Sequence, residues 1–163
     1  MTGEDVISVL PFNNTVDLVQ LSGHQILSLL EYNVAGLCPN MSCETVEFYQ
    51  VSGMRLVFDI RDNNQVLILV KCCILLHNIQ GSRVSSAMVR VSPGHYEPLQ
   101  SETHYRVVIT SFLLQPGKSP LAEMITEDDI RRGVTDYDAL TTYINQHSPV
   151  SSSLENRIIV NYV

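Results

Sequence analysis

An alternating segment that runs directly into a capped helix sets the first limit on the fold of this chain. Residues 15–21, TVDLVQL, alternate between apolar and polar positions, which predicts a half-buried strand. Ser22 then offers an N-cap with Gln25 as its capping-box partner, and Gly36 supplies a C-terminal stop. Apolar residues at helical spacing form one face of the predicted helix: Ile26, Leu27, Leu30 and Val34.

Strands and helices follow one another irregularly along the rest of the chain. Strands are predicted in residues 46–60 (two segments around Ser52-Gly53), 82–91, 104–112 and 155–160. One helix is predicted to start at Thr2 and to end before Pro11, and a later one to start at the cap Thr135. This order predicts the α+β class, with a mixed sheet and packed helices, in a single domain over residues 1–163.

The apolar run VLILVKCCILLHNIQ, residues 66–80, is atypical for its position. It separates MRLVFDIRDNNQ from GSRVSSAMVRV, two segments that would otherwise pair as a hairpin across an Asp-Asn-Asn turn. One interpretation is a further buried strand. The other is a translated intron, because Val codons begin with GT, one Gln codon ends in AG, and the run keeps the reading frame.

Composition and charge limit the kinds of partner. The formal net charge of −7 disfavours nucleic acid, because binding to polyphosphate rests on Lys and Arg. No apolar run reaches the roughly 20 residues that a membrane span requires. The acidic start, Met1 to Asp5, is unlike a signal peptide, so the sequence predicts no export signal within this chain.

Two features nevertheless favour an exported origin. Cys38 and Cys43 flank a short polar loop and could be bridged if the loop folds back, the alternative being two reduced thiols. Asn13 and Asn40 each begin an N-glycosylation acceptor pattern, although such patterns also arise by chance. The cysteine and histidine spacing does not favour a zinc site.

Two polar motifs suggest chemistry at first sight. Gly117-Lys118-Ser119 resembles the end of a phosphate-binding loop, but Phe112 stands where such a loop needs its first glycine. An acidic triplet at residues 127–129 precedes Arg131-Arg132, and it is more typical of a solvated turn with local ion pairs than of an acid–base pair. Neither motif indicates a catalytic site.

Four segments in order carry a resemblance to one family: VLPFNNTVDLVQLSGHQILSLLE, FYQVSGMRLVFD, HYEPLQSETHYRVVITSFL and LENRI. Together they resemble the C-terminal domain of the 5′-nucleotidase and apyrase family of metallophosphoesterases. Such proteins have an N-terminal domain that holds two zinc-like divalent metal ions and hydrolyses the phosphate, and a C-terminal domain that recognises the nucleoside. The resemblance implies an extracellular or cell-surface location.

The resemblance implies that Phe12 and Phe112 clamp a base between their rings, a contact worth about 1–3 kcal/mol per stacked base. The family loop Asn-Phe-Leu-Ala-Asn-Gly-Gly-Asp-Gly is altered here. Ser111 replaces its Asn, Gly117 lies in the altered glycine-rich part, and Lys118 replaces the Asp that accepts hydrogen bonds from the ribose hydroxyls. A Lys side chain has no acceptor.

The family's metal-binding and phosphate-binding motifs are not found in the sequence, so we expect no catalytic residue and no cofactor in this chain. The predicted function is therefore the nucleoside- or nucleoside 5′-phosphate-recognising domain of a 5′-nucleotidase-type hydrolase, catalytically incomplete without its N-terminal domain. The alternatives are a non-catalytic nucleoside-binding module and a degenerate remnant.

Overall fold

Helices and strands are mixed along the chain, as the sequence predicts. The computed structural model describes residues 2–35, 37, 48–61, 82–151 and 153–162. The chain divides into two units, one of Met1–Leu21 with His104–Ser153 and the other of Ser22–Thr103 with Leu154–Val163. Each unit combines a sheet with helices, and one of the sheets is mixed, so the predicted α+β class is confirmed.

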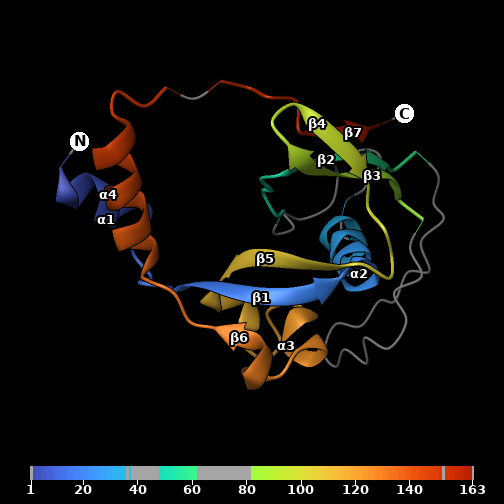
Figure 1. Cartoon of the computed structure of the whole chain (residues 1–163), viewed down its shortest axis with the longest axis horizontal. Coiled ribbons are helices and arrows are strands. Elements are labelled where there is room, and N and C mark those ends of the chain that lie inside the picture. The colour runs from blue at the N-terminus through green and yellow to red at the C-terminus, as the bar shows by residue number, and fades with distance from the viewer. Residues whose placement is uncertain (1, 36, 38–47, 62–81, 152, 163) are drawn as a thin grey trace. The chain divides into compact units, whose positions relative to one another are not determined.

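The first unit is built on a three-stranded sheet in the order β5-β1-β6 (Figure 1). Its strands are β1 (Val16–Ser22), β5 (His104–Thr110) and β6 (Ile130–Arg131), and β6 is antiparallel to β1. Its helical elements are α1 (Gly3–Val9), η1 (Ser111–Leu114), α3 (Leu121–Met124), η2 (Glu127–Asp129) and α4 (Asp136–His147). Helices α1 and α4 pack against each other.

The faces of β1 follow the alternation in its sequence. Val19 and Leu21 are buried among the core residues of the unit, and Asp17 on the same face is fully buried as well. The other face carries Val16 and Leu18, which are half-buried. A charged residue in an apolar row requires partners, which are described below.

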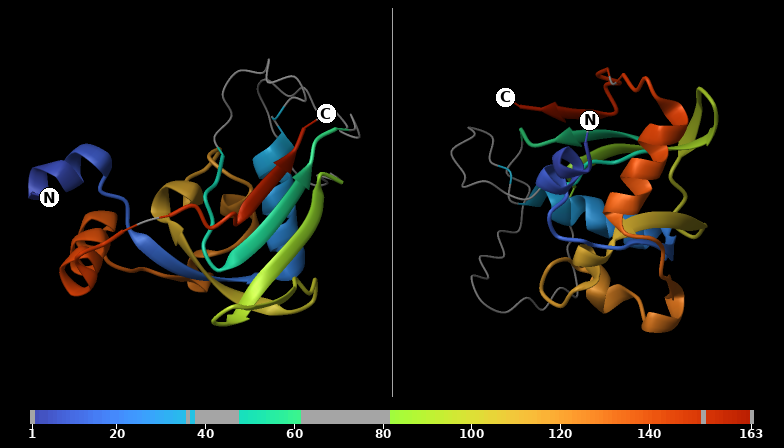
Figure 2. Two further views of the ribbon diagram at one scale, coloured as in Figure 1. Left: turned by 90° about the horizontal axis from the view of Figure 1, so that it is seen from above. Right: turned by 90° about the vertical axis from the view of Figure 1, so that its left-hand side faces the viewer.

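The second unit has a four-stranded sheet in the order β4-β3-β2-β7. Its elements are α2 (Gly23–Ala35), β2 (Met54–Asp59), β3 (Val84–Ser92), β4 (His95–Pro98) and β7 (Ile158–Asn161). Strand β7 is parallel to β2 and the other pairs are antiparallel, so this sheet is mixed. Helix α2 packs against the sheet along β3 (Figure 2).

The helix caps read from the sequence are confirmed. Ser22 N donates to Gln25 Oε1 at 2.8 Å and Gln25 N donates to Ser22 Oγ at 3.2 Å, which is the reciprocal capping box. Thr2 caps α1 in the same way with Asp5, and the Thr135 hydroxyl accepts from Asp138 N. These bonds satisfy backbone N–H groups that a helix start leaves open.

Two buried charged residues, Glu31 and Arg83, join α2 to the start of β3. The Glu31 carboxylate accepts from the backbone N–H groups of Arg83 at 3.1 Å and Val84 at 2.9 Å. Arg83 Nη1 donates to the carbonyl oxygens of Val34 and Leu37. Burial lowers the pKa of Arg83 and the nearby Glu31 charge opposes that shift. The pair therefore fixes the end of α2 against the sheet.

The predicted pairing of the segments that flank residues 66–80 is confirmed, because Met54 pairs with Val89 and Phe58 with Val84. The predicted strand before Gly53 is wrong for residues 48–51. There the Tyr49 N–H donates to Asn33 Oδ1 on α2 at 2.6 Å, and the Phe48 ring meets Phe58 edge to face. The strand predicted to reach Phe112 ends at Thr110, and β4 was not predicted. Gly36 and residues 66–80 lie outside the described residues.

Candidate functional site

The two predicted base-binding rings lie next to the ends of neighbouring strands of the first unit. Phe12 lies in the loop between α1 and β1, and Phe112 lies in η1, directly after β5. Strands β1 and β5 are adjacent in the three-stranded sheet. Strand pairing therefore brings together the two segments that carry the rings, although they lie far apart in the sequence.

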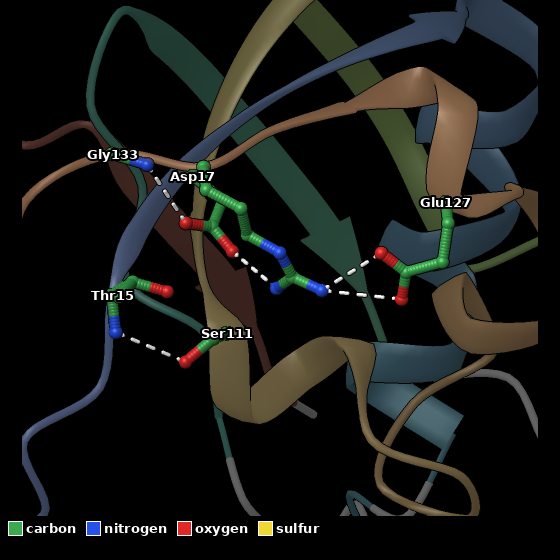
Figure 3. Close-up of polar contacts among 6 residues, drawn as sticks. Thr15, Asp17, Ser111, Glu127 and Gly133 are labelled. Atoms are coloured by element: carbon green, nitrogen blue, oxygen red, sulfur yellow. Dashed lines mark hydrogen bonds and ion pairs between the residues drawn. The ribbon is translucent and has the colours of Figure 1, made fainter.

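Two hydrogen bonds fix the ends of these strands to each other, and Figure 3 shows the one between Thr15 N and the Ser111 side chain. Ser111 N donates to Thr15 O at 2.8 Å, and Thr15 N donates to Ser111 Oγ at 3.0 Å. Phe112 follows Ser111 directly, whereas Phe12 precedes Thr15 by three residues, a reach of at most about 11 Å. The Ser111 side chain thus joins the two segments that carry the rings.

The exposure of the two rings differs. Phe12 is 81% exposed, so it is not part of the core of this unit. Phe112 is half-buried. A benzyl side chain left in water offers apolar area that a bound aromatic group could cover. The ring of Phe112 in η1 is therefore partly packed against the protein, whereas the ring of Phe12 in the loop before β1 is almost fully exposed to solvent.

A tight turn brings Lys118 to Phe112. Lys118 N donates to Gln115 O at 3.1 Å, and Gly117 between them has φ +75°. With Pro116 in the second position, this is the type II arrangement that requires glycine in the third. The Lys118 Nζ atom lies 5.2 Å from the centroid of the Phe112 ring, within cation–π range.

Buried Ser119 holds the end of that turn in place. Its hydroxyl donates to Leu113 O at 2.7 Å and accepts from Leu121 N at 3.1 Å. Residue 119 is 5% exposed, and Leu121 next to it is fully buried. The contact between Lys118 and the ring was not predicted from the sequence.

Beside the strand ends, the buried carboxylate of Asp17 holds the segment after β6 (Figure 3). It accepts from Arg132 Nη1 at 2.8 Å and from Gly133 N at 3.1 Å. Burial raises the pKa of this carboxyl, but hydrogen bonds from Gly133, Thr15 and Arg132 outweigh it and leave the pKa below its usual value. Asp17 is therefore ionised at neutral pH and serves as an anchor for the fold.

Arg132 also reaches the acidic triplet. Its Nη2 donates to both carboxylate oxygens of Glu127, at 3.0 and 3.1 Å, so the predicted local ion pair is confirmed. The bond to Asp17 was not predicted, because the two residues lie 115 positions apart. Both carboxylates raise the pKa of Arg132.

The remaining predicted residues are the two glycosylation candidates and the two cysteines. Asn13, the first glycosylation candidate, is exposed and has φ +51°. Cys38, Asn40 and Cys43 lie outside the described residues. Among the residues that the structure describes, no group of three or more His, Cys, Asp or Glu side chains is arranged to hold a metal ion. No helix in the described part is long and apolar enough to cross a membrane.

Comparison with known proteins gives consistent matches. The family model described as "5′-nucleotidase, C-terminal domain" matches residues 1–127. An apyrase from Tabanus yao is 33% identical over 162 residues, which are 97% of this chain and 26% of that protein. A 5′-nucleotidase from Bos taurus is 32% identical over 162 residues, 97% of this chain and 25% of its own length.

A solved structure agrees with these matches. The structure of a 5′-nucleotidase precursor from Thermus thermophilus aligns with a TM-score of 0.71 and 31% identity, over 98% of this chain and 28% of that one. This chain thus spans about a quarter of the length of the curated relatives that it matches.

Proposed function

The chain belongs to the 5′-nucleotidase C-terminal domain family, and we propose that it is the part of a 5′-nucleotidase-type hydrolase that recognises a nucleoside or a nucleoside 5′-phosphate. The observation that carries the proposal is the pair of hydrogen bonds between Thr15 and Ser111. These bonds hold together the two loops that display Phe12 and Phe112. A base stacked on these rings gains about 1–3 kcal/mol per ring without a particular hydrogen-bond pattern.

We propose that hydrolysis belongs to a part of the relatives that this chain does not match. The relatives are about four times as long as the segment that matches this chain, since it covers 26% and 25% of two of them. We expect the residues that bind two divalent ions and cleave the phosphate ester to lie in the portion that this chain does not match. The 163-residue chain alone is then expected to release no phosphate from AMP.

We also propose an extracellular or cell-surface location for the full protein. The exposed Asn13 in its acceptor pattern is compatible with glycosylation. Expression behind an export signal, followed by treatment with an N-glycosidase, should shift the mass of the wild type. An Asn13→Gln variant should lose the part of the shift that belongs to this site.

Titration calorimetry with adenosine and with AMP tests the recognition role. Replacing Phe12 and Phe112 together by Ala should weaken binding at least about fivefold, the loss of one stacking contact of about 1 kcal/mol. Tyr162→Ala removes another exposed ring, in the second unit, and should leave the affinity unchanged. Equal affinity for wild type and the double variant would contradict the clamp, and no binding by wild type would favour the remnant.

A further inference from the structure

The position of Lys118 suggests which ligands the rings select. We propose that Lys118 makes the Phe112 platform selective for nucleosides that carry a negative charge close to the base, over neutral nucleosides. The inference rests on the proposed function, since it assumes that an aromatic ligand stacks on Phe112. It adds a preference for anionic ligands, which stacking on the ring alone does not provide.

The first support is the fixed placement of the Lys118 backbone beside the ring. The turn from Gln115 to Lys118 is closed by a backbone hydrogen bond of 3.1 Å, and Gly117 adopts the φ of +75° that this turn needs. Buried Ser119 ties the end of the turn to Leu113. The backbone of Lys118 is thus held beside Phe112, and its Nζ lies 5.2 Å from the ring centroid.

The second support is the charge around Lys118. Its side chain is exposed, and it forms no salt bridge with any acid in the described part of the chain. A cation held by a ring quadrupole keeps its charge available to a second group. The chain as a whole carries a net charge of −7, which repels anions, so a local cation is needed to attract an anionic ligand.

A stacked ligand brings its substituents within reach of this ammonium. Aromatic groups stack at roughly 3.5–4 Å, so a base on the face of Phe112 opposite Nζ lies at most about 9 Å from it, close to one screening length in physiological salt. The flexible lysine stem can then turn the three N–H donors toward a carboxylate or phosphate. A neutral nucleoside offers no charge for this contact.

The expected selectivity is modest because the site is exposed to water. Exposed ion pairs contribute about 0.2–1 kcal/mol, which corresponds to a preference of up to about fivefold for the charged member of a matched ligand pair. The preference should shrink as salt rises, since screening weakens an exposed pair. These two properties distinguish the Lys118 contact from stacking, which is tolerant of salt.

The test uses ligand pairs that differ in one anionic group. Orotidine and uridine differ by a carboxylate on the base, whereas adenosine 3′-phosphate and adenosine differ by a phosphate on the sugar. The affinity ratio within each pair is measured by calorimetry for the wild-type chain, Lys118→Met and Lys118→Arg. The pair with the larger wild-type ratio identifies whether the charge is read on the base or on the sugar.

Wild type should prefer the charged ligand of at least one pair about two- to fivefold, Lys118→Met should lose the preference, and Lys118→Arg should keep it. Arg106→Met, which removes an exposed cation from β5, serves as the control for net charge and should not change the ratio. An equal ratio in wild type and Lys118→Met overturns the inference but leaves the proposed function standing. No binding of any of the four ligands by wild type overturns both.

Discussion

Replacing Asp17 by Asn should destabilise the first unit, and the size of the effect follows from the contacts of its carboxylate. Asn has the same shape and keeps one acceptor for the Gly133 N–H, which lies 3.1 Å from Asp17 Oδ1. The substitution removes the charge that faces Arg132 Nη1 at 2.8 Å and places an amide donor against another donor. The change is therefore electrostatic, with almost no loss of packing.

The magnitude is worked out from the two bonds. A hydrogen bond to a charged group contributes about 1.5–3 kcal/mol and a neutral one about 0.5–1.5 kcal/mol. Because the Arg132 side chain is 50% exposed and keeps Glu127, water and Glu127 offset part of the loss. We expect a decrease of about 1–2 kcal/mol in the free energy of unfolding, and a fall in Tm of about 2–8 °C.

Urea unfolding followed by circular dichroism measures this difference, with Glu127→Gln as the matched control. The Glu127 side chain is 80% exposed, so its loss should cost less than about 0.5 kcal/mol. Because the folded-state pKa of Asp17 is below its unfolded value, its contribution is complete above about pH 5 and disappears as pH falls through the folded pKa. Equal losses in the two variants, or a difference that persists unchanged at pH 2, would refute the anchor role.

Three further substitutions test contacts of the fold by the same unfolding assay. Glu31→Gln should cost about 1–3 kcal/mol, because the new amide group can accept from only one of the backbone N–H groups of Arg83 and Val84 and places a donor against the other. Gly23→Ala should cost about 1–3 kcal/mol, because the new Cβ would lie 2.1 Å from Gln100 O; a neutral result would show that this backbone moves freely. Gly117→Ala should cost about 1–2 kcal/mol through its positive φ alone, since no atom lies within 4 Å of the added Cβ, and Gly117→Asn should cost less.

The elements that the sequence predicts best are those with a local cause. The alternation in β1 and the Ser22–Gln25 capping box depend on residues a few positions apart, and both are present in the structure. The pairing of β2 with β3 was also predictable, because each flank of the 66–80 run has the composition of a hairpin strand.

The failures have non-local causes. Residues 48–51 have strand-like composition, but the side chain of Asn33 on α2 accepts from Tyr49 N and replaces a strand partner. Strand β4 has four residues, mostly polar, and is defined by its register with β3. Within the candidate site, the two Phe residues come from the family resemblance. The bond from Arg132 to Asp17 and the placement of Lys118 over Phe112 depend on tertiary contacts that no local pattern encodes.

The β2–β3 pair also determines how much change in length this part of the chain can accept. Asp59 N donates to Arg83 O at 2.7 Å, so both ends of the connection between these residues are held by the sheet. Residues 60–82 form that connection, and removing residues 66–80 would shorten it from 23 to 8 residues. We therefore expect a variant that lacks residues 66–80 to keep the register of β2 and β3.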